Sequence, residues 1–271
     1  MTTDKLTAVS EIEVPFAGIS QRAPGRPRLG GLAFAGVSKR FRDGTLALEE
    51  VSLSATAGEF VSIVGPSGCG KSTLLRMASG LTDATAGEIE VSADHIGFVF
   101  QDATLLPWRT VRRNVELLLE LHGVARAERR RQAQDAIDTV GLAGSEDKFS
   151  RALSGGMKMR VSLARSLTMS PEVFLFDEPF GALDEITRQR MNEEVLRLFG
   201  QRGFCGVFVT HSVAEAVFMS TRVLVMSGRP GRIVADIPIP FGFPRPPELR
   251  YRKEFGEVAG KVSEALKDSH R

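Results

Sequence analysis

The sequence contains little cysteine and few aromatic residues other than phenylalanine. Its 271 residues include two cysteines, one tryptophan and one tyrosine. Two cysteines are too few for the disulfide framework on which many small exported domains depend. Cys69 and Cys205 are therefore expected to be free thiols, which suits a reducing compartment such as the cytosol.

A long apolar segment is also missing. No window holds about 18 consecutive apolar residues, and the first 20 residues lack a basic segment followed by an apolar one. We therefore expect a chain that neither spans a membrane nor is exported. Strong charge of one sign is absent too, because 35 Lys and Arg residues oppose 33 Asp and Glu residues. This balance gives no indication of a nucleic-acid-binding protein.

What is present is enough apolar material for one large domain, or one domain with an inserted subdomain, at 42% hydrophobic and 25% charged residues. Residues 1–31 mix Ser, Thr, Pro, Gly and Arg without periodicity and predict a flexible N-terminal extension. The main domain is expected at residues 32–228, with a helical subdomain at about 102–165. A C-terminal extension follows at 229–271, proline-rich at first and amphipathic over 251–266.

Hydrophobic periodicity predicts a β-rich beginning and then alternating strands and helices. Strands are expected at 32–37, 46–53, 60–64, 88–91, 96–100, 173–176, 204–209 and 222–226. Helices are expected from the end of the third strand to Ser79, around 111–119, and at 126–140, 184–199 and 213–219. The sequence therefore predicts an α/β fold with a β-rich beginning and an inserted helical subdomain.

The clearest motif follows the third predicted strand. Gly65-Pro66-Ser67-Gly68-Cys69-Gly70-Lys71-Ser72-Thr73 matches the phosphate-loop pattern G-x-x-x-x-G-K-[ST]. Glycines allow the backbone to turn its N–H groups toward a triphosphate, and the following helix adds the positive end of its dipole. Lys71 supplies a cation for the β- and γ-phosphates, and Ser72 a hydroxyl for Mg²⁺. The alternative is a tight turn that happens to contain a lysine, which the strand-to-helix context disfavours.

Two further motifs accompany this loop. The apolar segment 173–176 ends in Asp177-Glu178-Pro179, which places both carboxylates at the carboxyl end of a buried strand, where ligands of parallel sheets bind. Leu153-Ser154-Gly155-Gly156-Met157 begins a helix whose N–H groups also suit a phosphate. In this order and spacing, the motifs resemble the ATP-binding subunit of an ABC transporter, over about residues 32–228. They are most similar to the nitrate, sulfonate and taurine importer branch. This resemblance implies an α/β fold with a P-loop NTPase core, an antiparallel β subdomain and an inserted helical subdomain.

The resemblance also implies roles for residues of the ATP site. Phe41 occupies the position of the aromatic residue that stacks on adenine. Asp177, with Ser72 and Gln101, would hold Mg²⁺, and Gln101 would also contact the attacking water. Glu178 would act as the general base and His211 would contact the γ-phosphate.

In this family, Ser154, Gly155 and Gly156 serve the ATP of a partner subunit. The resemblance therefore implies a homodimer that encloses two ATP molecules, with Asp184 in the loop that communicates between the subunits. It further implies integral membrane permease subunits, an extracytoplasmic solute-binding protein, and a peripheral position on the cytoplasmic face of the inner membrane. The expected function is ATP-driven uptake of nitrate, a sulfonate, taurine or a related solute, with no nucleic-acid partner.

Two other functions account for the sequence less well. A soluble ABC ATPase acting on nucleic acid or ribosomes usually carries a long coiled-coil insertion or two cassettes, and the sequence has neither. A P-loop kinase or GTPase does not account for residues 154–156.

Several single residues leave alternatives open. Met157 and Met159 stand where relatives commonly carry Gln, and Met159 is the less usual of the two. The basic cluster Arg126, Arg129, Arg130 and Arg131 suits a solvated helix face better than a lipid contact. Trp108 could pack in the core or contact a permease. His95 and His122 show no metal-binding pattern. Cys69 is expected to react with maleimide without nucleotide and to be shielded by Mg-ATP.

Overall fold

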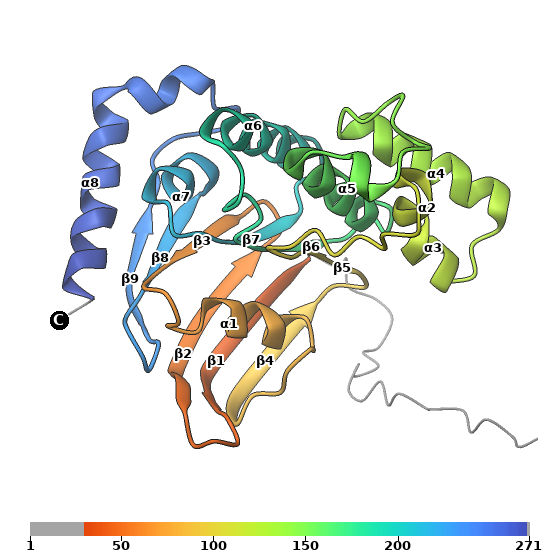
Figure 1. The fold of residues 1–271 in the computed structure, drawn as a ribbon. Coiled ribbons are helices and arrows are strands. Elements are labelled where there is room, and N and C mark those ends of the chain that lie inside the picture. Colours follow the sequence, from red (N-terminus) through yellow and green to blue (C-terminus); the bar gives the residue numbers. More distant parts are fainter. Residues whose placement is uncertain (1–29, 270–271) are drawn as a thin grey trace, which may run out of the picture.

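The computed structural model describes residues 30–269, so the extension predicted at 1–31 lies almost entirely outside the described residues. The described chain forms two sheets and a set of helices (Figure 1). The strands of the smaller sheet are, in spatial order, β2 (Leu46–Thr56), β1 (Gly31–Arg40) and β4 (Ala86–Ser92). Those of the larger sheet are β5 (Ile96–Val99), β6 (Val173–Asp177), β7 (Cys205–Val209), β3 (Phe60–Val64), β8 (Arg222–Met226) and β9 (Ile233–Pro238).

The smaller sheet is the predicted antiparallel subdomain. β1 pairs with β2 on one side and β4 on the other, with Leu32 opposite Ala55 and Val91. Alternate residues of β1 face inward, since Leu32 and Phe34 are buried while Ala35 is exposed. Antiparallel pairing allows this sheet to keep one face in solvent.

Five neighbouring strands of the larger sheet are parallel, and β9 joins its edge antiparallel to β8. The sequence did not predict β9, because prolines at 230, 238 and 240 suggested an irregular tail. Within residues 233–238, however, half-buried residues alternate with exposed ones, which is the pattern of a strand at a sheet edge. The sheet therefore continues past residue 228 into the segment assigned to the C-terminal extension.

The two faces of the larger sheet differ in composition and in what covers them. One face packs α1 (Lys71–Ala78) and the smaller sheet with aliphatic residues such as Ile63, Leu175 and Val207. The opposite face carries a cluster of stacked and tilted phenylalanines, including Phe60, Phe174 and Phe208, under the remaining helices. Period-two alternation along each strand separates the two sets of side chains.

The helices of this second face fall into three groups (Figure 1). They are α2 (Val111–Val115), α3 (Leu117–Leu121), α4 (Arg126–Thr139), α5 (Gly155–Leu167), α6 (Glu185–Arg202), α7 (Val213–Met219) and α8 (Lys253–Asp268), with 3₁₀ turns η1 (Ser150–Ala152) and η2 (Pro247–Tyr251). Helices α2 to α4 project at one end, α5 to α7 cover the middle, and α8 flanks β8 and β9. The single helix predicted around 111–119 is two short helices that meet at Glu116. Among residues 30–269, no helix is long and apolar enough to cross a membrane.

Candidate active site

The strand order brings most of the predicted site residues to one edge of the larger sheet. β5, β6, β7 and β3 are adjacent and parallel, so their carboxyl ends meet at the same edge. Gln101 follows β5, Asp177 ends β6, His211 follows β7, and the phosphate loop follows β3. Open parallel sheets bind their ligands at this edge.

The phosphate loop is shaped to bind an anion. Lys71 is buried, and its ammonium donates to the carbonyls of Gly65 (2.9 Å) and Pro66 (3.0 Å). Gly70 has φ of 107°, and a Cβ there would lie 2.6 Å from Leu48 Cδ2, so only glycine fits. No side chain caps the first turn of α1, which leaves its backbone N–H groups for a ligand. A cation, free helical N–H groups and a close-fitting backbone together suit a triphosphate.

Next to this loop, Ser72 and Asp177 place two oxygen ligands together. The Ser72 hydroxyl donates to Asp177 Oδ1 at 2.7 Å, although the residues are 105 positions apart in sequence. Burial raises the pKa of Asp177, and the hydrogen bond from Ser72 partly offsets that rise. Hard oxygen donors of this kind suit Mg²⁺, which usually takes only one or two protein carboxylates. The described residues contain no cluster of three or more His, Cys, Asp or Glu side chains for a metal held by protein alone.

Glu178 and His211 form a second pair at this edge. His211 Nδ1 lies 3.1 Å from Glu178 Oε2, and the Glu178 backbone N–H donates to the carbonyl of Val209. Glu178 has φ of 44°, a left-handed conformation that costs a non-glycine residue about 1 to 2 kcal/mol. Backbone strain of this kind is common where a side chain must be aimed at a reacting group. Each residue was predicted from its motif, but their direct contact was not.

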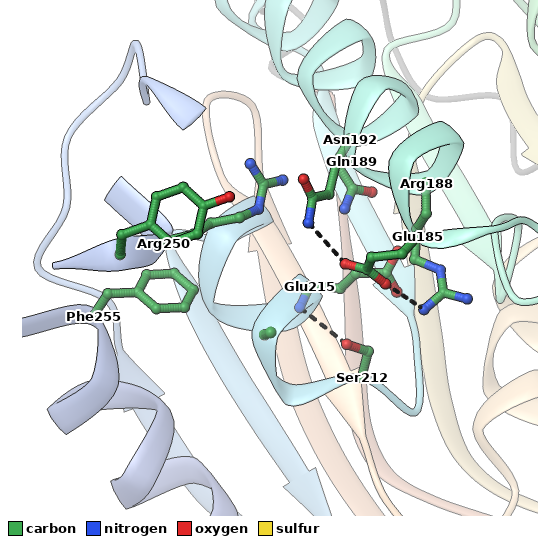
Figure 2. Close-up of a pocket in the computed structure, with 10 residues that line it drawn as sticks. Glu185, Arg188, Gln189, Asn192, Ser212, Glu215, Arg250 and Phe255 are labelled. Carbon is green, nitrogen blue, oxygen red and sulfur yellow. Dashed lines mark hydrogen bonds and ion pairs between the residues drawn. The ribbon is translucent and has the colours of Figure 1, made fainter. Parts of the chain in front are cut away.

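Sequence reasoning missed a polar network behind His211. Thr210 Oγ1 donates to Glu215 Oε2 at 2.5 Å and accepts a hydrogen bond from the Ser212 backbone N–H. Burial raises the pKa of Glu215. Asn192 and Glu215 both line a pocket of about 200 Å³ between α6, α7 and η2 (Figure 2). The Ser-x-x-Glu spacing of residues 212–215 is a helix-capping signal that could have identified Glu215.

Ser154, Gly156 and Asp184 lie together but in another part of the fold. Ser154 caps α5 by accepting from Met157 N–H, and Asp184 caps α6 by accepting from Thr187 N–H. Hydrogen bonds from the Thr187 side chain and then its backbone lower the pKa of Asp184. A Cβ on Gly156 would lie 2.8 Å from Thr187 Cγ2, so the two helix N-termini are in contact. α5 and α1 cover opposite faces of the sheet, and no described hydrogen bond or ion pair joins this group to Lys71.

Two predicted site residues stand apart from these clusters. Phe41 follows β1, and its ring is 42% exposed with the Lys39 ammonium 5.5 Å from the ring centroid. An exposed aromatic face at this position can stack on a base. Gln101 is exposed and forms none of the hydrogen bonds described for residues 30–269.

The structure also decides several open alternatives. Met159 is buried in the core beneath the phenylalanine face, where a thioether fits better than an amide. Trp108 is 71% exposed, so core packing is wrong for it. In the basic cluster, Arg131 pairs with Glu128 and Asp135 in solvent, whereas Arg129 is mostly buried beside Glu116.

The expectation of a reactive Cys69 is wrong. Its side chain is 1% exposed, and burial raises the pKa of the thiol. A thiol that is both inaccessible and protonated reacts slowly with maleimide. The loop turns the Cys69 side chain into the core, and the motif alone does not predict this orientation.

Comparison with known proteins agrees with this geometry. The family model described as ABC transporter matches residues 48–181. The chain is 42% identical to "Aliphatic sulfonates import ATP-binding protein SsuB 1" of Mesorhizobium japonicum, over 92% of this chain and 95% of the relative. It is also 42% identical to "Nitrate import ATP-binding protein NrtD" of a Synechocystis species, over 83% and 90%.

Among solved structures, it matches the dimeric ATP-binding cassette MJ0796 in a post-hydrolysis state bound to ADP and Pi. The TM-score is 0.68 at 32% identity, over 78% of this chain and all of the other.

Proposed function

The chain belongs to the family of ABC transporter ATP-binding subunits, and we propose that it powers uptake of a small solute through partner membrane subunits. The solute we propose is nitrate, a sulfonate, taurine or a related compound, because relatives of 42% identity carry sulfonate and nitrate import names. The observation that carries the proposal is the assembly of the phosphate loop, Asp177, Glu178 and His211 at one sheet edge.

In the proposed site, the residues divide the work of binding ATP. Lys71 and the N–H groups of α1 bind the β- and γ-phosphates, and Phe41 stacks on the adenine. Ser72, Asp177 and Gln101 would hold Mg²⁺, which would neutralise phosphate charge when bound. The Ser72–Asp177 hydrogen bond supports this assignment because it already brings two of the oxygens together.

For hydrolysis, we assign Glu178 as the general base that takes a proton from the attacking water. Its contact with His211 holds the carboxylate at the sheet edge, and His211 in turn would donate to the γ-phosphate. Phosphoryl transfer requires little covalent help from the protein, so positioning and electrostatics supply most of the acceleration.

We further propose that two copies enclose two ATP molecules. Ser154, Gly155 and Gly156 present a helix N-terminus that suits a phosphate, yet α5 lies across the sheet from α1 of the same chain. A second copy would supply these residues to Lys71 of the first, with Asp184 at the contact. The dimeric state of the related cassette MJ0796 supports this arrangement.

The membrane partners are also part of the proposal. Import through a membrane requires permease subunits, and an extracytoplasmic binding protein would deliver the solute. The subunit would then sit peripherally on the cytoplasmic face of the inner membrane. Trp108, exposed shortly after Gln101, is the residue that we propose contacts a permease.

Dimerisation gives the test of the composite site. Glu178→Gln should bind ATP and hydrolyse it very slowly, so light scattering with Mg-ATP should detect a dimer. Adding Ser154→Arg should keep the protein monomeric while each chain still binds ATP at Lys71. If the double variant dimerises as readily as Glu178→Gln alone, the composite site is wrong.

Transport itself is tested in the source organism. Deleting the gene should abolish growth on nitrate, or on taurine or another sulfonate as the sulfur source, and the wild-type gene should restore it. A Lys71→Ala gene should not restore growth. Normal growth of the deletion strain on all of these compounds would refute the proposed solute class.

A further inference from the structure

The segment that joins β8 to β9 packs directly against the phosphate loop. It contains Arg229-Pro230-Gly231-Arg232, and none of these residues has a role in the proposed reaction. β3 and β8 are adjacent and parallel, with Val64 opposite Val225. The residues that follow the two strands therefore leave the sheet at the same edge, and this geometry places 229–232 beside the loop.

Gly231 fixes the position of this segment. Its N–H donates to the Ala47 carbonyl at 2.9 Å, and its own carbonyl accepts from the Glu49 N–H at 3.1 Å. Gly231 is also buried against the backbone of Cys69, where a side chain has no room. The segment is thus hydrogen-bonded to β2 on one side and packs against the phosphate loop on the other.

Arg229 reaches from this anchored segment to the loop itself. Its Nε and Nη2 atoms donate to the carbonyl oxygen of Gly68 at 3.3 and 3.0 Å. The Gly68 carbonyl belongs to the same planar peptide as the Cys69 N–H, which points the opposite way. That N–H donates to the Pro66 carbonyl at 3.3 Å, so Arg229 and Pro66 hold the Gly68–Cys69 peptide from its two sides. A cation on the carbonyl also polarises the peptide and strengthens the N–H as a donor.

The same guanidinium lies near the turn that carries Phe41. The pKa of Asp43 is lowered mainly by hydrogen bonds from Thr45, with a smaller contribution from the charge of Arg229. The guanidinium of Arg229 therefore lies near both the phosphate loop and the β1–β2 turn. No other part of the C-terminal segment described here donates to residues 65–71.

We propose that Arg229 is a positioning residue of the ATP site. It holds the Gly68–Cys69 peptide in the conformation that binds phosphate, and it adds a positive charge beside the polyphosphate. The inference rests on the phosphate loop as the ATP site, and it gives the C-terminal segment a role in nucleotide affinity.

The test is a fluorescence titration of purified variants with Mg²⁺ and mant-ATP, paired with urea unfolding without nucleotide. Arg229→Ala should raise Kd about tenfold, because both the hydrogen bonds and the charge are lost. Arg229→Lys should raise it about threefold, because a point charge remains without the planar fork. The matched control is Arg232→Ala, three residues away, whose exposed ion pair with Glu49 should leave Kd within about twofold.

The results for these variants distinguish the role of Arg229 from the assignment of the phosphate loop as the ATP site. Wild-type affinity in Arg229→Ala would overturn the proposal, and so would a loss of unfolding free energy with no change in Kd. Equal losses of affinity in Arg229→Ala and Arg232→Ala would also overturn it, because a general loosening of the segment would then explain both. Lys71→Ala must abolish binding in the same titration, and if it does not, the phosphate-loop assignment itself is at fault.

Discussion

Replacing Gly231 with alanine should disturb both the stability of the fold and the nucleotide site. An added methyl carbon would lie well under 3.0 Å from the Cys69 carbonyl oxygen, 2.7 Å from Met226 Cε and 3.1 Å from Leu48 Cδ2. Met226 can change rotamer, but the Cys69 carbonyl is phosphate-loop backbone. The loop must therefore move, and a misplacement of roughly 1 Å in an active site can lower a catalytic rate by about 100-fold.

Overpacking of a close-fitting site typically costs about 1 to 3 kcal/mol of unfolding free energy. Urea unfolding without nucleotide should show a loss of this size for Gly231→Ala. A loss of about 1.4 kcal/mol of binding free energy at the displaced loop would raise the Kd measured by mant-ATP titration about tenfold. The control is Gly228→Ala in the same segment, where an added Cβ meets nothing within 4 Å. Its unfolding free energy should stay within about 0.5 kcal/mol of wild type. If Gly231→Ala matches Gly228→Ala in both measurements, the packing argument is refuted.

Three further predictions follow from burial and exposure. Burial raises the pKa of Asp177, so the charged carboxylate destabilises the fold at neutral pH. Asp177→Asn should therefore raise the unfolding free energy at pH 7, and this gain should disappear as the pH falls toward 4. The same variant should lose Mg-dependent hydrolysis. An unchanged free energy at pH 7 would contradict the assigned cost of burial. Cys69 should react with maleimide far more slowly than a free cysteine even without nucleotide, and rapid labelling would show that the loop opens. Trp108→Ala should change the unfolding free energy by less than about 0.5 kcal/mol, since the side chain is 71% exposed; a loss above 2 kcal/mol would place it in a core.

Local sequence patterns predicted most of the strands and helices. The phosphate loop is a contiguous motif whose conformation depends on its own glycines, so its position between β3 and α1 was predictable. The amphipathic segment at 251–266 became α8, because its apolar residues recur at helical spacing. β9 was missed because proline frequency is a poor guide at a sheet edge, where a strand can accommodate residues without an N–H.

The contacts within the site were not predictable in the same way, because they join distant parts of the chain. Ser72 and Asp177 are 105 residues apart, and Glu178 and His211 are 33 apart. A motif specifies which residue types are present, but the strand order decides which of them meet. The burial of Cys69 likewise depends on packing that no local pattern encodes.

Strand order also explains why the contact between Arg229 and Gly68 was overlooked, and it shows what would have revealed it. These residues are separated by 161 positions, and nothing near Arg229 in sequence resembles a phosphate site. Once β8 is placed parallel to β3, the segments after the two strands must emerge at the same edge of the sheet. Gly65–Gly70 and 227–232 are then neighbours before any side chain is considered. Which side chain then reaches the loop depends on its position, because Arg229 contacts Gly68 whereas Arg232 pairs with Glu49. The fact missing from the sequence was that β8 pairs with β3.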